Sequence, residues 1–294
     1  MSDKKILALG YFDSLHLGHQ QVISLAQKVA KANGVDLSVF TFDGNLKKAL
    51  YNQEDKRVFT NSERSDIFAE LGVKDVFYAP VTPEFLSLNE REFLDYLNSK
   101  MQIIGYVCGE DYRFGKNGNG NVDFLKKYAS VNGQLVDVAK TFMLNQEKVS
   151  TTSIKRLLAL GQVCNANKLL GRNFFVDGEV FEDRKVGTKI GFPTINVKLD
   201  EEKATLKKGV YYGHVFLNKQ KYKTIINYGE RPTFNLNKTV LEAHIIDFSG
   251  DLYGKKVRLF FNGFLREIVQ FTNVLELKTQ LAKDMQAVKG KVYD

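Results

Sequence analysis

Two histidines lie three residues apart near the start of the chain, in the segment Gly10-Tyr-Phe-Asp-Ser-Leu-His-Leu-Gly-His19. A short apolar run precedes the segment and a helical pattern follows it, so the segment is expected at the carboxyl edge of a parallel sheet, where ligands bind. His16 and His19 would present two imidazoles beside a helix N-terminus, and such donors stabilise charge that develops on a phosphate. Gly18 would let the phosphate approach the backbone.

A chemical role for this histidine pair is favoured over plain turn and cap residues, because two of the chain's 4 histidines fall here. A metal pair is the weaker interpretation, since no third ligand follows nearby in the sequence. The turn contains neither a Walker A loop nor a Gly-x-Gly-x-x-Gly fingerprint, which argues against the two commonest nucleotide folds.

Three further groups of residues could carry chemistry, although each also has a simpler interpretation. Ser150-Thr-Thr-Ser-Ile-Lys155 offers hydroxyls and a cation near a helix start, which suits phosphate but also fits a plain N-cap. Thr194 and Asn196 supply oxygen ligands of the kind that Mg²⁺ takes, in the string Phe192-Pro-Thr-Ile-Asn196 that could equally be a turn. Glu242 could act as a general base or form an exposed cross-strand ion pair.

The elements that must position these residues differ between the two halves of the chain. In the first half strand-like and helix-like segments alternate, which predicts an α/β fold with a mostly parallel sheet and helices on both faces. The predicted strands are Ile6–Leu9, Leu37–Phe42, Val73–Tyr78 and Ile103–Cys108, and the predicted helices are Leu17–Ala32, Ser62–Leu71 and Glu90–Met101.

From about Gly171 the segments become short, β-branched or aromatic, and separated by turns, which predicts an antiparallel sheet or barrel. Period-two alternation places Leu241, Ala243 and Ile245 on one face of a strand and Glu242 on the other. The predicted strands are Phe174–Phe181, Gly209–Leu217, Lys223–Asn227, Val240–Phe248 and Lys256–Phe261, and an amphipathic helix is predicted over Val274–Val288.

Length and composition agree with two ordinary globular domains. The chain has 294 residues, of which 44% are hydrophobic and 26% charged. A net charge of +8 favours anionic partners, but no block of like charges indicates a nucleic-acid tail. Two cysteines form neither a disulfide framework nor a zinc motif, and no signal peptide or membrane span is recognised. These features predict a soluble, cytoplasmic protein.

The motifs of the first half resemble, in order, those of the adenylyltransferase module of bacterial FAD synthetases. Gly10–His19 is similar to a segment that holds the H-x-G-H signature of nucleotidyltransferases. Gly109-Glu-Asp-Tyr-Arg-Phe-Gly115 is similar to the G-x-D/N-F-x-F-G motif, and Ser150–Lys155 to the S-S-T-x-I-R motif. The resemblance implies that His16 and His19 are catalytic. It implies that ATP and its phosphates contact Gly10, Phe12, Gly18, Asp111, Arg113, Ser150, Thr151, Thr152 and Lys155.

Three positions depart from that pattern. Ser14 stands where the family usually has glycine, and Lys155 stands where it has arginine, which replaces a bidentate contact with a point charge. Thr41-Phe-Asp-Gly-Asn-Leu46 lies where the family commonly has a Pro-His-Pro turn. These changes are expected to weaken or re-tune adenylyl transfer.

The second half resembles riboflavin kinases. Phe192–Asn196 is similar to the G-x-P-T-A-N signature, with Ile195 in the alanine position. Asn227–Phe234 is similar to an N-x-G-x-R-P-T-F turn, and Leu241–Phe248 is similar to the E-x-H-x-x-D-F stretch that precedes D-L-Y-G.

This second resemblance implies roles for particular residues. Glu242 would be the general base on the riboflavin 5′-hydroxyl, Mg²⁺ would be held through Thr194 and Asn196, and Arg266 would lie near the flavin. The phosphates of ATP would lie near Gly187, Gly191 and Pro193.

Over nearly the whole chain, the resemblance implies a Rossmann-like nucleotidyltransferase domain in residues 1–166. It implies an antiparallel β-barrel kinase domain with a C-terminal helix in residues 167–294. The expected activity is phosphorylation of riboflavin to FMN and adenylylation of FMN to FAD with release of pyrophosphate, using ATP and Mg²⁺. Neither nucleic acid nor membrane is an expected partner. The alternatives are a chain with one active half, the transferase being the more doubtful, or a non-catalytic flavin- or RNA-binding regulator.

Overall fold

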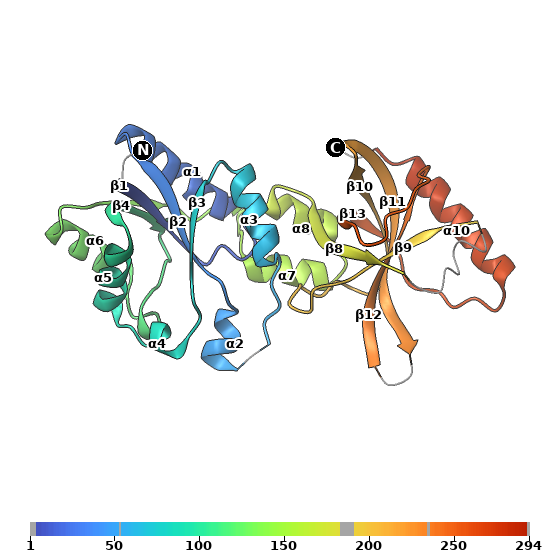
Figure 1. The fold of residues 1–294 in the computed structure, drawn as a ribbon, viewed down its shortest axis with the longest axis horizontal. Helices are drawn as coiled ribbons and strands as arrows, with labels where there is room; N and C mark the ends of the chain where they lie inside the picture. The colour runs from blue at the N-terminus through green and yellow to red at the C-terminus, as the bar shows by residue number, and fades with distance from the viewer. Residues whose placement is uncertain (1–3, 53, 183–190, 234–235, 293–294) are drawn as a thin grey trace. The chain divides into compact units, whose positions relative to one another are not determined.

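The computed structural model describes residues 4–52, 54–182, 191–233 and 236–292. The chain divides into two compact units, Met1–Thr151 and Thr152–Asp294, each with its own sheet (Figure 1). The division predicted after residue 166 falls inside helix α8 (Val163–Leu170) and stays a prediction. Among the described residues, no helix is both long enough and apolar enough to span a membrane.

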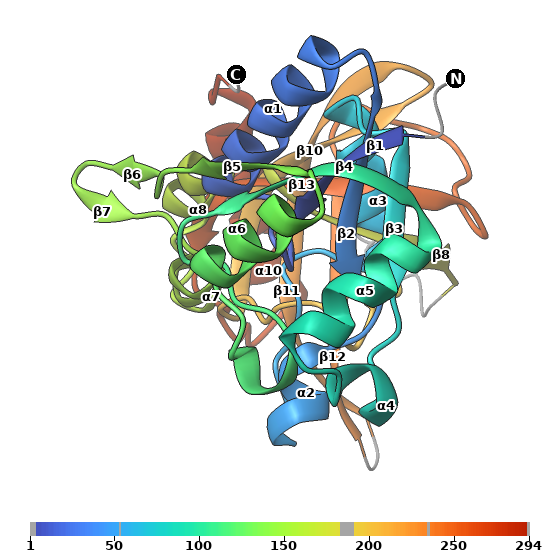
Figure 2. The same cartoon turned by 90° about the vertical axis from the view of Figure 1, so that its left-hand side faces the viewer.

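The first unit is the predicted α/β fold. Five parallel strands pair in the order β3-β2-β1-β4-β5. Helices α1 and α3 cover one face of this sheet, and α5 and α6 cover the other (Figures 1 and 2). The strands are β1 (Lys4–Leu9), β2 (Asp36–Phe42), β3 (Asp75–Ala79), β4 (Gln102–Gly109) and β5 (Leu135–Ala139); the main helices are α1 (Leu17–Ala32), α3 (Asn61–Glu70), α5 (Glu90–Lys100) and α6 (Val122–Val131).

Short elements complete this unit around the carboxyl edge of the sheet. They are α2 (Leu46–Tyr51), α4 (Pro83–Leu86), the 3₁₀ turn η1 (Lys116–Gly118), β6 (Met143–Leu144) and β7 (Glu147–Lys148). The sequence patterns did not predict these elements, nor β5 and α6.

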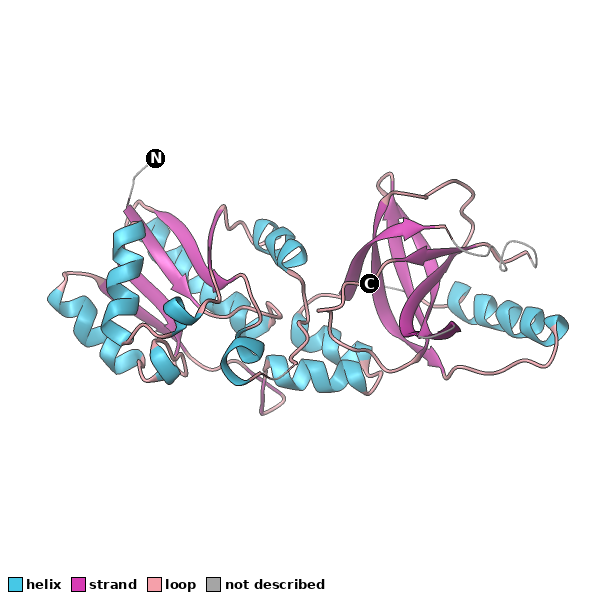
Figure 3. Cartoon of the chain, turned by 60° about the horizontal axis from the view of Figure 1, so that its bottom comes forward, coloured by secondary structure: helices cyan, strands magenta, loops and turns pink. Residues whose placement is uncertain are grey.

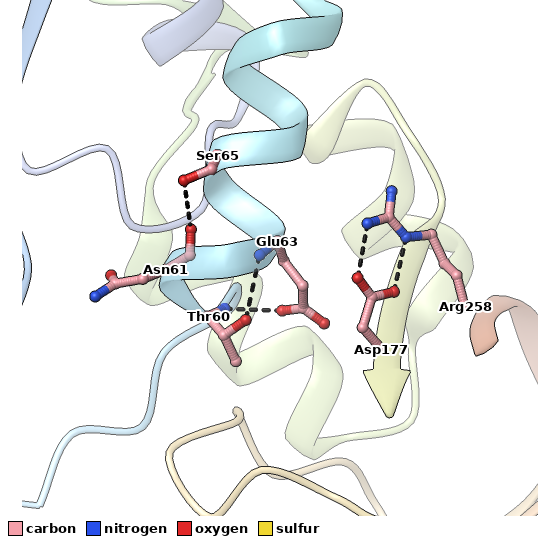
Figure 4. Close-up of polar contacts among 6 residues, drawn as sticks. All are labelled: Thr60, Asn61, Glu63, Ser65, Asp177 and Arg258. Atoms are coloured by element: carbon pink, nitrogen blue, oxygen red, sulfur yellow. Dashed lines mark hydrogen bonds and ion pairs between the residues drawn. The ribbon is translucent and has the colours of Figure 1, made fainter. Parts of the chain in front are cut away.

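Local sequence signals account for the helix starts. In α3 the Thr60 hydroxyl accepts a hydrogen bond from the Glu63 N–H at 3.3 Å, and the Glu63 carboxylate accepts one from the Thr60 N–H at 2.8 Å (Figure 4). Such a capping box satisfies two backbone donors that a helix leaves unpaired. Asn89 and Glu92 cap α5 in the same way.

The strand order places the first motif at the point where the direction of winding reverses. β1 lies between β2 and β4, and all three strands run parallel. In open parallel sheets, ligands bind outside the carboxyl ends of the strands at such a reversal. Gly10–His19 follows β1 and Gly109–Gly115 follows β4, so both motifs meet at that edge.

The second unit contains a closed antiparallel barrel with the strand order β10-β11-β12-β9-β8-β13 (Figure 3). Leu241, Ala243 and Ile245 are buried and Glu242 is only partly buried, so the predicted alternation is confirmed. Its strands are β8 (Phe174–Phe181), β9 (Thr194–Val197), β10 (Gly209–Leu217), β11 (Gln220–Thr233), β12 (Leu236–Ile245) and β13 (Lys256–Arg266), and its helices are α7 (Thr151–Ala159), α8 and α10 (Val274–Lys289).

Strand β11 extends further than the sequence pattern predicted, and an ion pair joins β13 to β8. The segment from Asn227 to Thr233, expected as a turn, belongs to β11, because that strand continues its ladder with β12 as far as Thr233. On the neighbouring strands, Arg258 and Asp177 form a bidentate ion pair with two bonds of 2.7 Å (Figure 4), which ties β13 to β8.

Candidate active sites

The two histidines of the first unit lie against each other. The rings of His16 and His19 stack at 3.7 Å between centroids, with 17° between their planes. His16 is the N-cap of α1, and its Nδ1 accepts the backbone N–H of His19 at 3.2 Å. His16 therefore acts as a cap residue, and its chemical role stays a prediction.

Glycines make room for this arrangement. A Cβ on Gly10 would lie 2.7–2.9 Å from atoms of the Phe12 ring, and a Cβ on Gly18 would lie 3.0 Å from Cε1 of His16. Phe12 in turn packs edge-on against His19, with 5.3 Å between ring centroids. Gly10 and Gly18 therefore lie where a larger residue would collide with Phe12 or His16.

Both histidines are neutral near pH 7. Burial lowers the pKa of His16 to about 4, and the nearby charges of Asp111 and Lys148 act on it in opposite directions. Burial, the neighbouring His16 and the charge of Arg64 hold the pKa of His19 well below its usual range. Because Nδ1 of His16 is an acceptor, the neutral ring carries its proton on Nε2 and offers an N–H donor there.

The second and third motifs reach the same edge of the sheet. Ser14 and Thr151 share a hydrogen bond of 2.9 Å between their hydroxyls, although 137 residues separate them. Asp111 accepts a 2.5 Å hydrogen bond from Lys148, which stands on β7.

The other predicted phosphate ligands lie close to these residues along the chain. Arg113 follows β4 with its side chain exposed, and Ser150 directly precedes α7. Thr152 and Lys155 belong to α7 and to the second compact unit.

The loop after β2 is held by side chains rather than by prolines. The carbonyl of Asp43 accepts hydrogen bonds from Nη2 of Arg57 at 3.0 Å and from Nδ2 of Asn61 at 2.5 Å. A Cβ on Gly44 would lie 2.7 Å from two atoms of the Val81 side chain, so only glycine fits there. The Pro-His-Pro turn is absent, but the loop has other fixed points.

In the second unit the predicted kinase residues come together across two strands. Glu242 on β12 pairs in register with Asn196 on β9 and with Asn227 on β11. The Thr194 hydroxyl donates a 2.6 Å hydrogen bond to Oε1 of Glu242. Asn196 is only 7% exposed. A carboxylate, a hydroxyl and an amide thus face one region of the barrel.

The residues before β9 have fixed backbone contacts. Gly191 adopts a left-handed conformation with φ of 84°, which favours glycine. The carbonyl of Pro193 accepts a 2.8 Å hydrogen bond from Nδ1 of His244, whose ring packs against Phe192. His244 therefore orients the signature string. Gly187 lies outside the described residues.

Arg266 is engaged within the unit. Its guanidinium forms a bidentate ion pair with Asp284 of α10, with bonds of 2.7–3.0 Å, and Nη1 donates to the carbonyl of Glu267. Just beyond it a groove of about 420 Å³ runs between the following segment and α10; it is lined by Val269, Gln270, Phe271, Leu275, Glu276, Thr279, Gln280 and Lys283.

Several residues of these sites were not predicted from the sequence. Lys148, Arg64 and Asp284 each contact or act on a predicted site residue, yet none belongs to a motif. The paired Lys148 was detectable only as a cation two residues before the Ser150 hydroxyl. Asp284 and Arg64 had no signal, since a charged residue in a helix is usually solvated.

The first unit has an α/β sheet with two histidines at the point where the strand order reverses. The second unit is a barrel with its own cluster of oxygen-bearing side chains. Together these features define a two-domain enzyme of phosphate transfer. Comparison with known proteins narrows this class. Residues 1–153 match the family model for FAD synthetase, and residues 170–292 match that for riboflavin kinase. The chain belongs to the bifunctional riboflavin kinase/FMN adenylyltransferase family.

Curated relatives match along nearly their whole length. The bifunctional riboflavin kinase/FMN adenylyltransferase of Listeria monocytogenes serovar 1/2a is 32% identical over 97% of this chain and 92% of its own. That of Bacillus subtilis strain 168 is 31% identical over 96% and 91%. A solved structure described as a macrolide-efflux protein from Streptococcus pneumoniae has a TM-score of 0.91 and 28% identity, over 99% of this chain and 96% of that one. The two share their fold from end to end.

Proposed function

We propose that this chain uses ATP twice. The barrel unit phosphorylates riboflavin to FMN, and the α/β unit transfers AMP from ATP to FMN, which yields FAD and pyrophosphate. The corresponding domains are residues 167–294 and 1–166. The observation that carries this proposal is the Thr194–Glu242 hydrogen bond of 2.6 Å beside Asn196, which provides a base next to two neutral oxygen donors. Family membership of both halves supports it.

In the kinase reaction Glu242 takes the proton of the riboflavin 5′-hydroxyl as that oxygen attacks the γ-phosphate of ATP. Thr194 and Asn196 would hold Mg²⁺, because their hydroxyl and amide oxygens are hard donors of the kind this ion takes. The ion supplies neutralisation of charge on the phosphates. Thr194 can contact both Glu242 and Mg²⁺, because its hydroxyl proton is donated to Glu242 and the lone pairs of its oxygen stay available for the ion. Gly191 and Pro193 bring the backbone close to the ATP phosphates.

In the adenylyl transfer a phosphate oxygen of FMN attacks the α-phosphorus of ATP and pyrophosphate leaves, so no covalent enzyme intermediate is required. His16 donates a hydrogen bond from Nε2 to the oxygen on which charge develops, and the stacked His19 supports it. The ATP phosphates contact Gly10, Phe12, Gly18, Asp111, Arg113, Ser150, Thr151, Thr152 and Lys155.

The flavin ring of riboflavin occupies the groove beside α10. Its volume of about 420 Å³ lies within the range of small-molecule sites, and Val269, Phe271 and Leu275 give it apolar walls. Arg266 contributes by tying α10 to β13 at one end of this groove.

One assay tests both reactions. Purified protein is incubated with riboflavin, ATP and Mg²⁺, and the products are separated by chromatography. FMN followed by FAD is expected. If only FMN forms, the chain lacks adenylyltransferase activity. If the chain converts supplied FMN but not riboflavin, it lacks kinase activity. His19→Ala should abolish FAD formation and spare FMN formation, whereas Glu242→Gln should abolish FMN formation from riboflavin and spare FAD formation from supplied FMN. If the wild-type chain forms neither product, it is a flavin binder and the proposed function fails; if both variants keep both reactions, the roles assigned to His19 and Glu242 are wrong.

A further inference from the structure

The turn that carries the histidine pair has an unfavourable backbone. Phe12 and Leu15 have φ values of 46° and 47°, in the left-handed region that residues with a side chain seldom adopt. Both side chains are buried, at 1% and 0% exposure. Strain of this kind is unfavourable and persists only where surrounding contacts impose it. Something outside the turn must therefore hold it.

Arg64, which is 1% exposed, contacts this turn and the two elements beside it. Its Nη1 donates to the carbonyl of Tyr11 at 3.0 Å and to the hydroxyl of Thr41 at 3.1 Å. Its Nη2 donates to the carbonyl of Phe42 at 2.6 Å and to Oδ1 of Asn61 at 2.5 Å. One guanidinium thus joins the first turn, the end of β2 and the start of α3.

Two further contacts converge on the same turn. The Thr41 hydroxyl, which accepts from Arg64, donates to the Tyr11 carbonyl at 2.7 Å. Asp13, 1% exposed, accepts the N–H of Val58 at 3.2 Å through Oδ1. The charge of Asp13 acts on Arg64 in the sense that stabilises the guanidinium, and the charge of Arg57 acts in the opposite sense.

We propose that Arg64 is a positioning residue for the adenylyl transfer, which holds the strained turn Tyr11–Leu15 so that His16 and His19 meet the α-phosphate. It acts through the backbone of the turn and touches no reacting atom. The fork of the guanidinium is required, because a lysine ammonium is a single point that cannot span three elements. This inference rests on the proposed function of the first unit.

The test variant is Arg64→Lys, which keeps the charge and loses the fork. We expect the kcat of adenylyl transfer to fall about 10- to 100-fold, since displacement of catalytic groups by about 1 Å has effects of that size. The KM values for ATP and FMN should change less than about threefold. Riboflavin phosphorylation by the same chain should stay unchanged, which shows that the barrel unit is folded, and a thermal melt of the variant shows whether the α/β unit is folded.

The matched control is Thr60→Ala on the same helix. It removes the N-cap of α3 and so destabilises that helix, but it leaves every hydrogen bond of the Arg64 side chain in place. We expect a lower melting temperature with an unchanged kcat of adenylyl transfer. If Thr60→Ala and Arg64→Lys lower kcat alike, Arg64 has only a structural role and the proposal is overturned.

A second readout does not require turnover. The imidazole of His16 is followed by NMR titration, with Asp111 and Lys148 as the charges that face it and Arg64 as the charge near His19. In Arg64→Lys the turn relaxes toward water, so the pKa of His16 should rise from about 4 toward its ordinary 6.5. An unchanged pKa and an unchanged kcat overturn the proposal. If the wild-type protein forms no FAD, the proposed function fails, and the NMR titration alone decides the role of Arg64.

Discussion

Replacing Asp284 by asparagine tests how Arg266 contributes to the kinase unit. Nε of Arg266 lies 2.9 and 3.0 Å from the two carboxylate oxygens of Asp284, and Nη2 lies 2.7 Å from one of them. The side chain of Asp284 is 3% exposed and that of Arg266 is 20% exposed. If Arg266 acts on the flavin by holding α10, then loss of Asp284 should reproduce the loss of Arg266.

The expected magnitude follows from this burial. Removal of one partner of a buried ion pair costs about 3–5 kcal/mol, because the other charge stays buried without compensation. Water reaches part of the Arg266 side chain, so Asp284→Asn should lie at the lower end, about 3 kcal/mol. Arg266→Met should cost a similar amount. The double variant Arg266→Met/Asp284→Asn leaves no buried charge, and we expect a coupling of about 1–3 kcal/mol between the two sites.

Unfolding is best followed through the kinase reaction itself. A chain with two units does not unfold in one step, so a global signal would mix both transitions. Residual riboflavin phosphorylation after incubation in urea reports the barrel unit alone, and the KM for riboflavin is measured in parallel without urea. Gln280→Ala is the matched control: it removes a 2.8 Å hydrogen bond from a neutral amide to the same carboxylate and should cost about 1.5 kcal/mol, less than the loss of the ion pair.

Two results would refute this reasoning. A cost below about 1 kcal/mol for Asp284→Asn would mean that the pair is not desolvated as its geometry indicates. A riboflavin KM that rises at least tenfold in Arg266→Met but stays constant in Asp284→Asn would mean that Arg266 binds the flavin directly, and that α10 is held by other contacts.

Three further predictions follow from single contacts. Gly213→Ala should destabilise the barrel unit by about 3 kcal/mol or more, because its Cβ would lie 1.9 Å from a backbone carbonyl oxygen of β13. Gly191→Ala has open space around the Cβ but a left-handed φ, so it should cost about 1 kcal/mol. Urea titration of kinase activity measures both costs. Through His16 the first unit should lose up to about 3 kcal/mol as pH falls from 6.5 to about 4, because the unfolded chain protonates His16 before the folded unit does. Thermal melts of wild type and His16→Gln at each pH measure this slope, which should be smaller in the variant, where His19 alone contributes. Ser14→Ala breaks the hydroxyl contact with Thr151 and should lower the stability of the first unit by about 1 kcal/mol, with a rise in the KM for ATP that exceeds the change in kcat.

The regular elements were largely predictable because their signals are local. The 16 residues of α1 were predicted to the residue, since apolar spacing and the Asn33-Gly34 stop both lie within the helix or next to it. β8 and β10 were predicted with equal accuracy. β11 was underestimated, because pairing with β12 carries the strand through Arg231 and Pro232, which have weak strand propensity of their own.

The contacts that complete the sites were not predictable in this way. The Ser14–Thr151 bond joins residues 137 positions apart, and the Arg266–Asp284 pair joins a strand to a helix. Each depends on where two elements meet, and no periodicity within one element carries that information. The motifs predicted which residues gather at each site, but the buried polar partners that fix them appear only in the folded chain.

The loop after β2 shows why a missing motif is not the same as a missing function. Prolines fix a turn by limiting the conformations of the unfolded chain, whereas this loop is fixed in the folded state. Asp43 is held by Arg57 and Asn61 through its carbonyl, and Gly44 packs too tightly against Val81 for any larger residue. Tertiary hydrogen bonds therefore give this loop the rigidity that prolines would give through local stereochemistry. The loop without Pro-His-Pro therefore has fixed points of its own at this edge of the sheet, and the weaker adenylyl transfer expected from the missing turn stays a prediction.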